Sequence, residues 1–490
     1  MTSDDNSDIG VDTGSWTETS FGSTRRQKFA IGLAAVFAAV MAGFGVYGIA
    51  RNDSGQDESQ TQNQNQTAET VAQPQEATTA SFTKPEHIVL LMTDDQGFGQ
   101  AGYLGHPTLK TPNLDAMAAS GTVLDQFYAQ APICSPTRVS ILTAEHPYRR
   151  DCFTVGGCSL DHGVTTLADS MSMAGYSTAH FGKWHIGNLG NQGRRVNSND
   201  TVTPDKAGFD TYFTHQLFFD IGQNEFYTND GFVTVDVTQD TSVFLAEKAI
   251  THITEQVQAG QPSFTIVWYP SPHSDYISAD EFADSDSTAD QLYGEIKGFD
   301  ESVGMIRTAL KDLGIADSTF LMFNSDNGAS SGRNYPDNFA NAGLRGGKNS
   351  LYQGGIRVPA IIEYPGLSMP STVSTPISTI DIMPTLLELT GAAVPPALDG
   401  VSRVAALQGQ PDPNGLYFWY DGEVEQVNSI DESTAAYIQW PNKLIKNGAD
   451  SYEQYDLSID PNETNDIYSV ADSASLVTAL ESWQAGILAN

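Results

Sequence analysis

The sequence contains few cations. Its 490 residues include 24 Lys and Arg against 60 Asp and Glu, so the formal net charge is -36. The chain lacks the surplus of positive charge that neutralises phosphates, which argues against a nucleic-acid partner. The same charge would repel a highly anionic polymer at low salt. Any Lys or Arg beside a polar cluster is therefore informative.

Cysteine is also scarce, with three residues in the whole chain. Cys152 and Cys158 are close enough in sequence to close the loop CFTVGGC with a disulfide, provided that this part of the chain leaves the reducing cytosol. Cys134, in the segment CSPTR, is then left over, either unpaired or chemically altered.

Charge is absent from residues 29–50, an apolar run long enough to span a bilayer. Basic residues directly precede it, so the positive-inside rule predicts a cytosolic, polar N-terminus at 1–28 and a transmembrane anchor at 29–50. Everything after the anchor would be exported to the periplasm or the cell exterior. The alternative is a secreted protein whose signal is removed, because TRRQKF at 24–29 loosely resembles a twin-arginine signal.

Large apolar residues are nearly absent from residues 51–83, where Gln, Asn, Thr and Ser dominate. Such a composition buries too little surface to offset the entropy lost on ordering, so we predict a disordered linker. The folded part then comprises a large domain at 84–400 and a C-terminal subdomain at 401–490, where the segments become shorter.

Apolar runs typical of buried strands alternate with amphipathic helical patterns across the larger domain. The helical pattern at 240–260 places these residues on one face: Val243, Ala246, Ile250, Ile253 and Val257. The alternation predicts an α/β fold in which helices flank a large mixed, mostly parallel central sheet. The C-terminal segments predict a small antiparallel sheet with a helix packed on it.

Polar clusters directly follow the predicted strands. The residues concerned are Asp94 and Asp95, Lys183 and His185, His273, and Asp326 and Asn327. In open α/β sheets, ligands bind outside the carboxyl ends of the strands, so we expect these side chains at one edge of the sheet.

Hard oxygen ligands dominate this set, and they suit calcium or magnesium rather than zinc. They belong to Asp94, Asp95, Asp326 and Asn327. Three cations lie near the same predicted edge, namely Arg138, Lys183 and Lys348. A divalent ion with several cations forms a site for a tetrahedral oxyanion such as sulfate or phosphate. Taken singly, each motif is more often a turn, a cap or a solvated residue.

The segment CSPTR at 134–138 resembles the sulfatase signature Cys-x-Pro-x-Arg, whose cysteine is oxidised to formylglycine. Other motifs of that family occur in the family's order: TDDQG, GKWHIG, PSPH, SDNG, GGK, YQGGIRVP, DIMPTLLELTG and YEQYDLSIDPNETND. The resemblance implies an alkaline-phosphatase-like fold and a formylglycine-dependent type I, arylsulfatase-like enzyme. Such an enzyme hydrolyses carbohydrate or aryl sulfates to an alcohol and inorganic sulfate.

Carried over residue by residue, the resemblance implies a role for each cluster. Calcium, in preference to magnesium, would be bound by Asp94, Asp95, Asp326, Asn327 and the modified Cys134. Arg138 would hold the formylglycine, and Lys183 and Lys348 would bind the sulfate oxygens. His185 and His273 would handle the protons, with His273 also contacting the substrate. A formylglycine-generating enzyme is implied as a maturation partner.

The chain departs from the family pattern just after CSPTR. Where the family continues Leu-Thr-Gly-Arg, this chain has Leu142, Thr143, Ala144 and Glu145. The departure bears on recognition by the maturation enzyme and leaves the metal and sulfate ligands intact.

Two other functions fit the pattern. A phosphodiesterase or phosphonate monoester hydrolase of the same superfamily would use the same oxyanion site, with leaving group and charge deciding between esters. The third interpretation is a non-catalytic binding protein on an anchored stalk, although every catalytic position of the pattern is filled. Loops such as 188–232 and 274–290 would select the group that carries the sulfate.

Overall fold

The computed structural model describes residues 82–488, apart from 156–157, 159, 161–162, 188, 190–201, 280–281, 332–334, 413 and 421–433. The predicted cytosolic segment, the anchor and nearly all of the linker lie outside these residues. No helix within them is both long and apolar enough to cross a bilayer. Phe82 and Thr83, the last residues of the predicted linker, pair with Leu367 and Gly366 and belong to the folded part.

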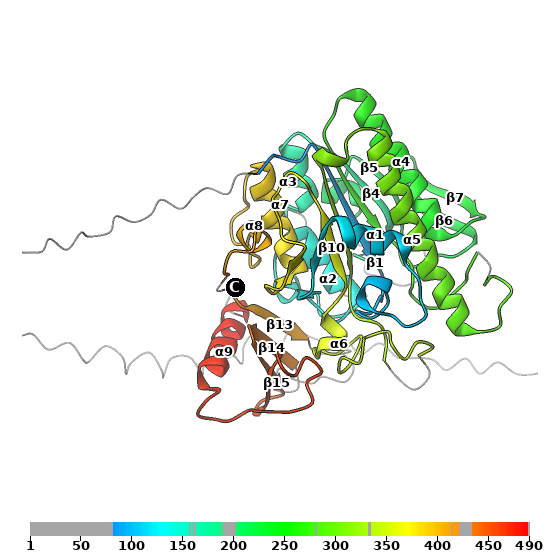
Figure 1. Cartoon of the computed structure of the whole chain (residues 1–490). Helices are drawn as coiled ribbons and strands as arrows, with labels where there is room; N and C mark the ends of the chain where they lie inside the picture. The colour runs from blue at the N-terminus through cyan, green and yellow to red at the C-terminus, as the bar shows by residue number, and fades with distance from the viewer. Residues whose placement is uncertain are drawn as a thin grey trace, which may run out of the picture. The chain divides into compact units, whose positions relative to one another are not determined.

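A ten-stranded sheet forms the centre of the fold (Figure 1). Its strands, in the order they lie in the sheet, are β11 (Thr372–Val373), β2 (Thr122–Leu124), β10 (Ala360–Glu363), β9 (Thr319–Ser325), β1 (His87–Thr93), β8 (Ser263–Trp268), β4 (Ser177–Lys183), β5 (Thr211–His215), β6 (Gly222–Thr228) and β7 (Gly231–Val237). The five from β9 to β5 are parallel, whereas β10, β6 and β7 are antiparallel to their neighbours. The predicted large, mixed and mostly parallel sheet is therefore confirmed.

Helices cover both faces of this sheet (Figure 1). One face carries α1 (Pro112–Ser120), α4 (Thr241–Ala259) and α5 (Thr288–Asp312), and the other carries α2 (Cys134–Thr143), α3 (Leu167–Met173) and α7 (Ile382–Thr390). Strand β1 contributes to both cores, because Val89 and Leu91 pack with the first set and Ile88, Leu90 and Met92 with the second. A strand buried on both faces has a continuous apolar sequence rather than an alternating one.

Helix α4 confirms the predicted helix at 240–260 and most of its predicted face. Ala246 and Ile253 are buried, and Ile250 and Val257 are partly buried and pack against the same core. Val243 is outside this core, and the prediction was wrong there. Phe244, Leu245 and Ala249 are buried in addition, because Phe244 and Leu245 offer more apolar surface to the core than Val243 does.

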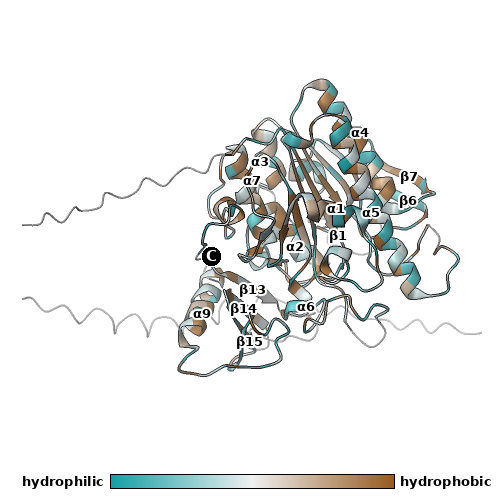
Figure 2. Cartoon of the chain, in the orientation of Figure 1, coloured by the Kyte–Doolittle hydropathy of each residue, from teal (hydrophilic) through white to brown (hydrophobic). Residues whose placement is uncertain are grey.

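The predicted antiparallel sheet with a helix forms the C-terminal part. Its strands are β13 (Leu416–Tyr420), β14 (Thr434–Gln439), β15 (Asn442–Asn447) and β16 (Ser451–Asp456), followed by α9 (Ala474–Leu488). One face of the sheet packs against α9, and the other packs against Ile133 and Leu351 of the larger domain. Hydrophobic residues gather along the strands of both sheets (Figure 2).

Shorter elements complete the described chain. Strands β3 (Phe127–Tyr128) and β12 (Ile377–Ser378) pair with each other, and α6 (Gln353–Ile356) and α8 (Val404–Leu407) are single turns of helix. Cys152 and Cys158, the predicted pair, form a disulfide. The carbonyl oxygen of Cys158 accepts a hydrogen bond of 2.6 Å from the N–H of Gly187, so the closed loop supports the segment that follows β4.

Candidate active site

The register of the central strands brings the acidic motifs together. Strand β1 pairs with β9 up to Thr93 opposite Ser325, so the next residues, Asp94 and Asp326, leave the sheet side by side. Strand β4 ends at Lys183 on the same edge, because it is parallel to β8 and through it to β1. The expectation that carboxyl ends of parallel strands share one edge therefore holds here.

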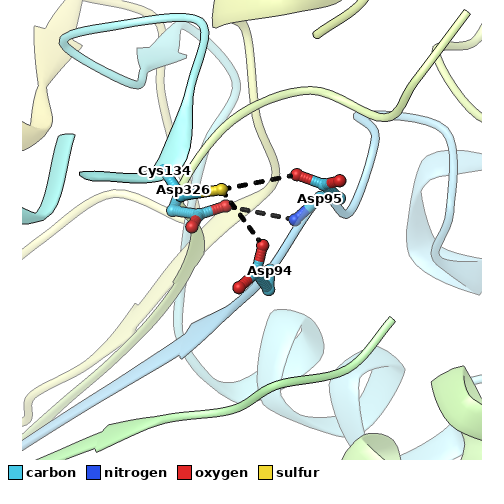
Figure 3. Close-up of side chains that lie close together, drawn as sticks. All are labelled: Asp94, Asp95, Cys134 and Asp326. Atoms are coloured by element: carbon cyan, nitrogen blue, oxygen red, sulfur yellow. Dashed lines mark hydrogen bonds between the residues drawn. The ribbon is translucent and has the colours of Figure 1, made fainter. Parts of the chain in front are cut away.

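Asp94, Asp95, Cys134 and Asp326 form a buried cluster (Figure 3). One potential ligand atom of each residue lies within 4.8 Å of the others. The Cys134 thiol donates toward Asp94 Oδ1 at 3.4 Å, and its Sγ lies 3.9 Å from Asp95 Oδ1. The backbone N–H of Asp95 donates to Asp326 Oδ1 at 3.1 Å. Segments that are far apart in the sequence therefore meet around the Cys134 side chain.

Helix α2 begins at Cys134 and presents Arg138 one turn later, on the same side. The guanidinium of Arg138 is fully buried and donates to Asp94 Oδ2 at 3.1 Å and to Asp326 Oδ2 at 2.8 Å. It also donates to the Lys183 carbonyl at 3.0 Å. Arg138 thus holds two carboxylates and the end of β4 together, and its predicted contact with a formylglycine stays a prediction.

Two lysines complete the cationic part of the site. The Nζ of Lys183 is buried and pairs with Asp94 Oδ2, and the Nζ of Lys348 donates to Asp95 Oδ2 at 2.7 Å. The N–H of Asn349, next to Lys348, donates to the carbonyl of Pro132 at 2.8 Å, which ties this loop to the CSPTR segment. With Arg138, the three cations balance the three carboxylates of the cluster in formal charge.

Two glycines allow the backbone segments of the site to approach closely. A Cβ atom on Gly328, the glycine of SDNG, would lie 1.9 Å from the carbonyl oxygen of Gly354. One on Gly355 would lie 1.9 Å from the carbonyl oxygen of Ser350. Any side chain at either position would push the loop of Lys348 away from the end of β9.

The surroundings of the cluster shift its protonation equilibria. Burial alone would raise the pKa of Asp94, but Lys183 and Arg138 outweigh it and hold that pKa well below its usual range. Burial, and after it the neighbouring Asp94 carboxylate, raises the pKa of Asp326 to about 6. Burial, and then Asp94, raises the pKa of the Cys134 thiol well above its ordinary value. An unmodified Cys134 is therefore a protonated thiol and a poor nucleophile at neutral pH.

The two predicted histidines differ in their surroundings. Burial, and after it Lys183 and Arg138, lowers the pKa of His185 well below its ordinary value, so its imidazole is neutral. Its Nδ1 is buried and has no hydrogen-bond partner among the described residues. The side chain of His273 is 20% exposed; its Nδ1 donates to the Ser274 carbonyl, and its Nε2 lies 3.7 Å from Asp95 Oδ2.

The donor set fits a hard divalent cation. Asn327 Nδ2 donates to Asp95 Oδ1 at 2.7 Å, whereas Asn327 Oδ1 is buried and accepts no hydrogen bond from any described residue. A buried amide oxygen without a donor is costly, and a cation beside it removes that cost. Three carboxylates around one point, with a buried amide oxygen on the residue after Asp326, suit calcium or magnesium. A sulfur ligand suits neither ion, which favours replacement of the Cys134 thiol by an oxygen function.

The departure at Ala144 has a structural counterpart. Ala144 ends helix α2 in the left-handed region, with φ 52°, where the family pattern has glycine. An L-residue with a Cβ atom adopts this conformation at a cost that glycine avoids. Its carbonyl oxygen accepts hydrogen bonds from the N–H groups of Asp399 and Gly400, at 2.9 and 3.0 Å, which keep it there.

Sequence reasoning missed Glu295, which supports the loop of His273. Glu295 is buried in α5; one carboxyl oxygen accepts from Ser271 Oγ and the other from the N–H of Ile277 at 3.1 Å. A signal was present, because Glu295 interrupts the apolar stripe that Leu292, Ile296 and Phe299 form. Reasoning also missed Phe218, and no pattern in its loop marks that residue.

The comparisons with known proteins agree on one family. Residues 86–392 match the family described as Sulfatase, and residues 347–485 match N-sulphoglucosamine sulphohydrolase, C-terminal. The N-acetylgalactosamine-6-sulfatase of Canis lupus familiaris is 30% identical over 421 residues, which cover 78% of this chain and 76% of that protein. Because the second match crosses residue 400, the predicted domain boundary there stays a prediction.

Solved structures share the fold. Ps i-CgsB in complex with k-i-k-neocarrahexaose has a TM-score of 0.68 at 24% identity, covering 82% of this chain and 93% of its own. The phosphonate monoester hydrolase of Agrobacterium radiobacter has a TM-score of 0.59 at 21% identity, covering 83% and 96%. At these identities the likeness concerns the fold alone and does not separate sulfate from phosphonate esters.

Proposed function

This chain belongs to the sulfatase family of sulfuric ester hydrolases, and we propose that it hydrolyses sulfate monoesters of carbohydrates with a formylglycine made from Cys134 and a bound calcium ion. The observation that carries the proposal is the buried cluster of Asp94, Asp95, Cys134 and Asp326. The names of similar proteins support the substrate class, since one is an N-acetylgalactosamine-6-sulfatase and one was solved in complex with k-i-k-neocarrahexaose.

Calcium would be held by the three carboxylates, by Asn327 Oδ1 and by the oxygen function at position 134. When bound, it supplies positive charge that stabilises the reacting oxyanion and raises the acidity of a hydroxyl group beside it. It would also compete for the carboxylates that now engage Lys183 and Lys348. Both ammonium groups are then free to bind the oxygens of the sulfate group, where charge accumulates during the reaction.

Oxidation of Cys134 replaces a protonated thiol with an aldehyde, whose hydrate offers the nucleophilic hydroxyl for attack on sulfur. Asp326 is placed to accept a proton there, because burial keeps its pKa near 6, although Asp94 is also close. Arg138 fixes both carboxylates and thereby keeps the nucleophile aligned with the sulfate site.

The two histidines would divide the proton transfers. His273 would act as the acid in its imidazolium form, because its Nδ1–H is committed to the Ser274 carbonyl and the proton given to the leaving alcohol oxygen must be a second one, on Nε2. His185, neutral and with a free Nδ1 among the described residues, would take the proton whose removal releases sulfate. An acid and a base in separate surroundings are what a two-step hydrolysis needs.

Export of the folded part is supported by the Cys152–Cys158 disulfide, which persists in oxidising compartments. The anchor at 29–50, the linker and the maturation enzyme remain predictions from the sequence. Recovery of active protein from a membrane fraction or from the medium separates a retained anchor from a removed signal.

Mass spectrometry tests the modification directly. Trypsin releases the peptide from Thr111 to Arg138, and a formylglycine form has lost one sulfur and two hydrogens and gained one oxygen. We expect this form in active preparations. An active preparation with only the thiol form would contradict the proposal.

Cys134→Ser tests the chemistry. Serine offers one hydroxyl and no second one through which sulfate is released, so we expect about one equivalent of alcohol in a burst and then no turnover. Cys134→Ala, the matched control, should give no burst. Sustained turnover by Cys134→Ser would refute the scheme.

Parallel assays with aryl sulfate, aryl phosphate and phenyl phosphonate esters separate the sulfatase from the phosphonate hydrolase, and a preference for phosphonate would overturn the proposed substrate.

A further inference from the structure

The loop after β5 places an exposed aromatic ring on His273. Phe218 is 38% exposed, and its ring stacks on the His273 imidazole with 4.9 Å between centroids and 15° between planes. The Nε2 of that imidazole lies 3.7 Å from Asp95 Oδ2. Phe218 therefore stands beside the position that the proposed function gives to the leaving oxygen, where the group bearing the ester must pass.

We propose that Phe218 is the platform on which the sugar ring bearing the sulfate ester lies, and that this subsite takes a ring without a second anionic group. The inference rests on the proposed function and narrows its substrate to a monosulfated, otherwise uncharged sugar. One face of a pyranose presents C–H groups, and such a face binds well against an aromatic ring. Binding sites for small molecules combine apolar walls of this kind with a few polar groups.

The backbone under Phe218 is fixed by its neighbour. Phe219 is 3% exposed, and its ring packs edge-on against Phe226 at 4.8 Å and lies 5.3 Å from the ring of His215. Phe219 thus anchors the loop in the core while Phe218 points outward. A platform that is already in place loses little conformational entropy when a ligand binds.

The same loop is tied to the segment of His185. The carbonyl of Gln216 accepts a hydrogen bond of 2.9 Å from the N–H of His185, and its side chain donates to the Gly187 carbonyl at 2.8 Å. Gln216 thus ties the loop by hydrogen bonds to the His185 segment, and Phe218 ties it by ring stacking to His273. The loop is therefore fixed to both histidine segments, while part of the Phe218 ring stays open to a ligand.

The charges around the platform argue against a second anion. Asp220 follows Phe218 by two residues, and Asp275 follows His273 by two. The stacking of Phe218 on His273 brings these two segments together. Consistent with this, burial, and after it Asp275, raises the pKa of Asp220 to about 6. No Lys or Arg occurs in residues 216–232 or 274–290; the cations of the longer segment 188–232, namely Arg194, Arg195 and Lys206, all precede β5 in the sequence. An additional sulfate or carboxylate here would meet like charge without a cation from either loop.

The test compares Phe218→Ala with wild type on a panel of monosulfated hexoses and N-acetylhexosamines and their disaccharides, with sulfate release as the readout. For the best substrate we expect KM to rise about tenfold and kcat to stay within about twofold. Phe218→Trp should keep KM near the wild-type value. Phe232→Ala is the matched control, because Phe232 is also 38% exposed but lies on β7.

Each of the other possible results would contradict one defined part of the proposal. A fall in kcat at constant KM would mean that Phe218 only positions His273. An unchanged KM, whatever happens to kcat, would show that Phe218 does not bind the sugar ring. Wild-type activity on 4-nitrophenyl sulfate but on no sugar of the panel would overturn the sugar subsite alone. Release of sulfate from no ester at all would instead overturn the proposed function.

A separate double substitution tests the role of the two carboxylates near Phe218. Asp220→Asn/Asp275→Asn should raise kcat/KM for a disulfated sugar several-fold relative to the same sugar with one sulfate, measured at low salt where the repulsion is least screened. Phe232→Ala again serves as the control and should keep the wild-type ratio. An unchanged ratio in the double variant would show that the two carboxylates do not select the substrate.

Discussion

Asn327 is the residue whose environment most directly points to a bound cation. Its Oδ1 is buried without a donor among the described residues, while its Nδ2 is engaged by Asp95. Asn327→Ala deletes this candidate ligand together with the Nδ2 hydrogen bonds to Asp95 and to the Gly328 carbonyl, at 2.7 and 2.9 Å. A calcium titration separates the two effects, because only the loss of a ligand changes the calcium concentration that stabilises the protein.

We expect calcium to raise the thermal unfolding midpoint of the wild type by a few degrees and to do so for Asn327→Ala only at concentrations at least about tenfold higher. Differential scanning fluorimetry after chelation and calcium titration measures both. Asn324→Ala, a buried asparagine of β9 outside the ligand set, is the control and should respond like wild type. A wild-type midpoint that calcium does not move would contradict the assignment.

The raised pKa of Glu295 in the folded protein predicts that stability depends on pH. Burial, and after it Asp240, raises the pKa of Glu295 to about 8, whereas in the unfolded chain it ionises near its ordinary value of about 4.3. Between these values the folded state binds the proton that the unfolded state has released, so this group's contribution to stability falls as the pH rises from about 4.5 to 8.

Glu295→Gln removes this dependence, since a neutral amide does not titrate in this range, keeps an acceptor for the N–H of Ile277 and leaves a polar group beside Ser271 Oγ. We expect equal urea midpoints near pH 4.5 and a variant that is more stable by roughly 2 to 4 kcal/mol at pH 8. Glu301→Gln, at an exposed position of the same helix, should follow the wild-type profile. A constant difference at all pH values would show that Glu295 is ionised in the fold.

The convergence of the candidate ligand residues was predictable because Asp94 and Asp326 each follow a strand that its own composition reveals. Asp94 and Asp326 required only the rule that parallel strands end at one edge. The contacts of Arg138 were not predictable, since its partners depend on how α2 lies across the strand ends. Phe218 was missed because an exposed aromatic residue in a loop has no periodic context.

At the level of elements, the C-terminal sheet supports the loop that carries Lys348. Lys443 on β15 is buried; its Nζ donates to the Leu351 carbonyl at 2.7 Å and pairs with Glu463 Oε1 at 2.6 Å. Glu463 Oε2 accepts from the N–H of Gln353 at 2.6 Å. Strands far from the reaction therefore hold the segment next to Lys348.

Glu463→Gln leaves the buried Lys443 ammonium without its anion, so we expect a loss of about 3 to 5 kcal/mol in stability and a lower kcat/KM. Lys443→Met/Glu463→Leu should recover much of the stability. The exposed pair Lys446–Glu481, 3.4 Å apart in the same subdomain, is the control, and Glu481→Gln should cost less than about 1 kcal/mol. If Glu463→Gln and Glu481→Gln lowered the unfolding free energy equally, the proposed support of the Lys348 loop by the C-terminal sheet would be contradicted.

The strands that the sequence revealed include β1, β4, β8 and β9, whose residues are almost all buried. The antiparallel edge of β6 and β7 was not predicted, because partly exposed residues alternate there without a strong apolar run. Val243 was misplaced on the core face of α4 for a related reason. Periodicity locates a helix well, but the exact face depends on the volume that the neighbouring helix and sheet leave.

For the molecule as a whole, the net charge of -36 opposes the approach of any anionic ester. We expect kcat/KM to rise several-fold between about 10 and 200 mM NaCl, because the Debye length falls from about 30 Å to below 10 Å. The rise should be steeper for a disulfated substrate. Sucrose of equal osmolality is the control, and a steady fall with salt would mean that the site cations dominate the encounter.

The seclusion of Cys134 has a consequence for the order of events during biosynthesis. Its side chain is 1% exposed, and the strand that supplies Asp326 emerges from the ribosome long after it. An oxidising enzyme has access only until those later strands close over the thiol. If the oxidising enzyme is added to this protein after folding and purification, the protein should stay inactive. If both are produced together in the same cell, the protein should be active.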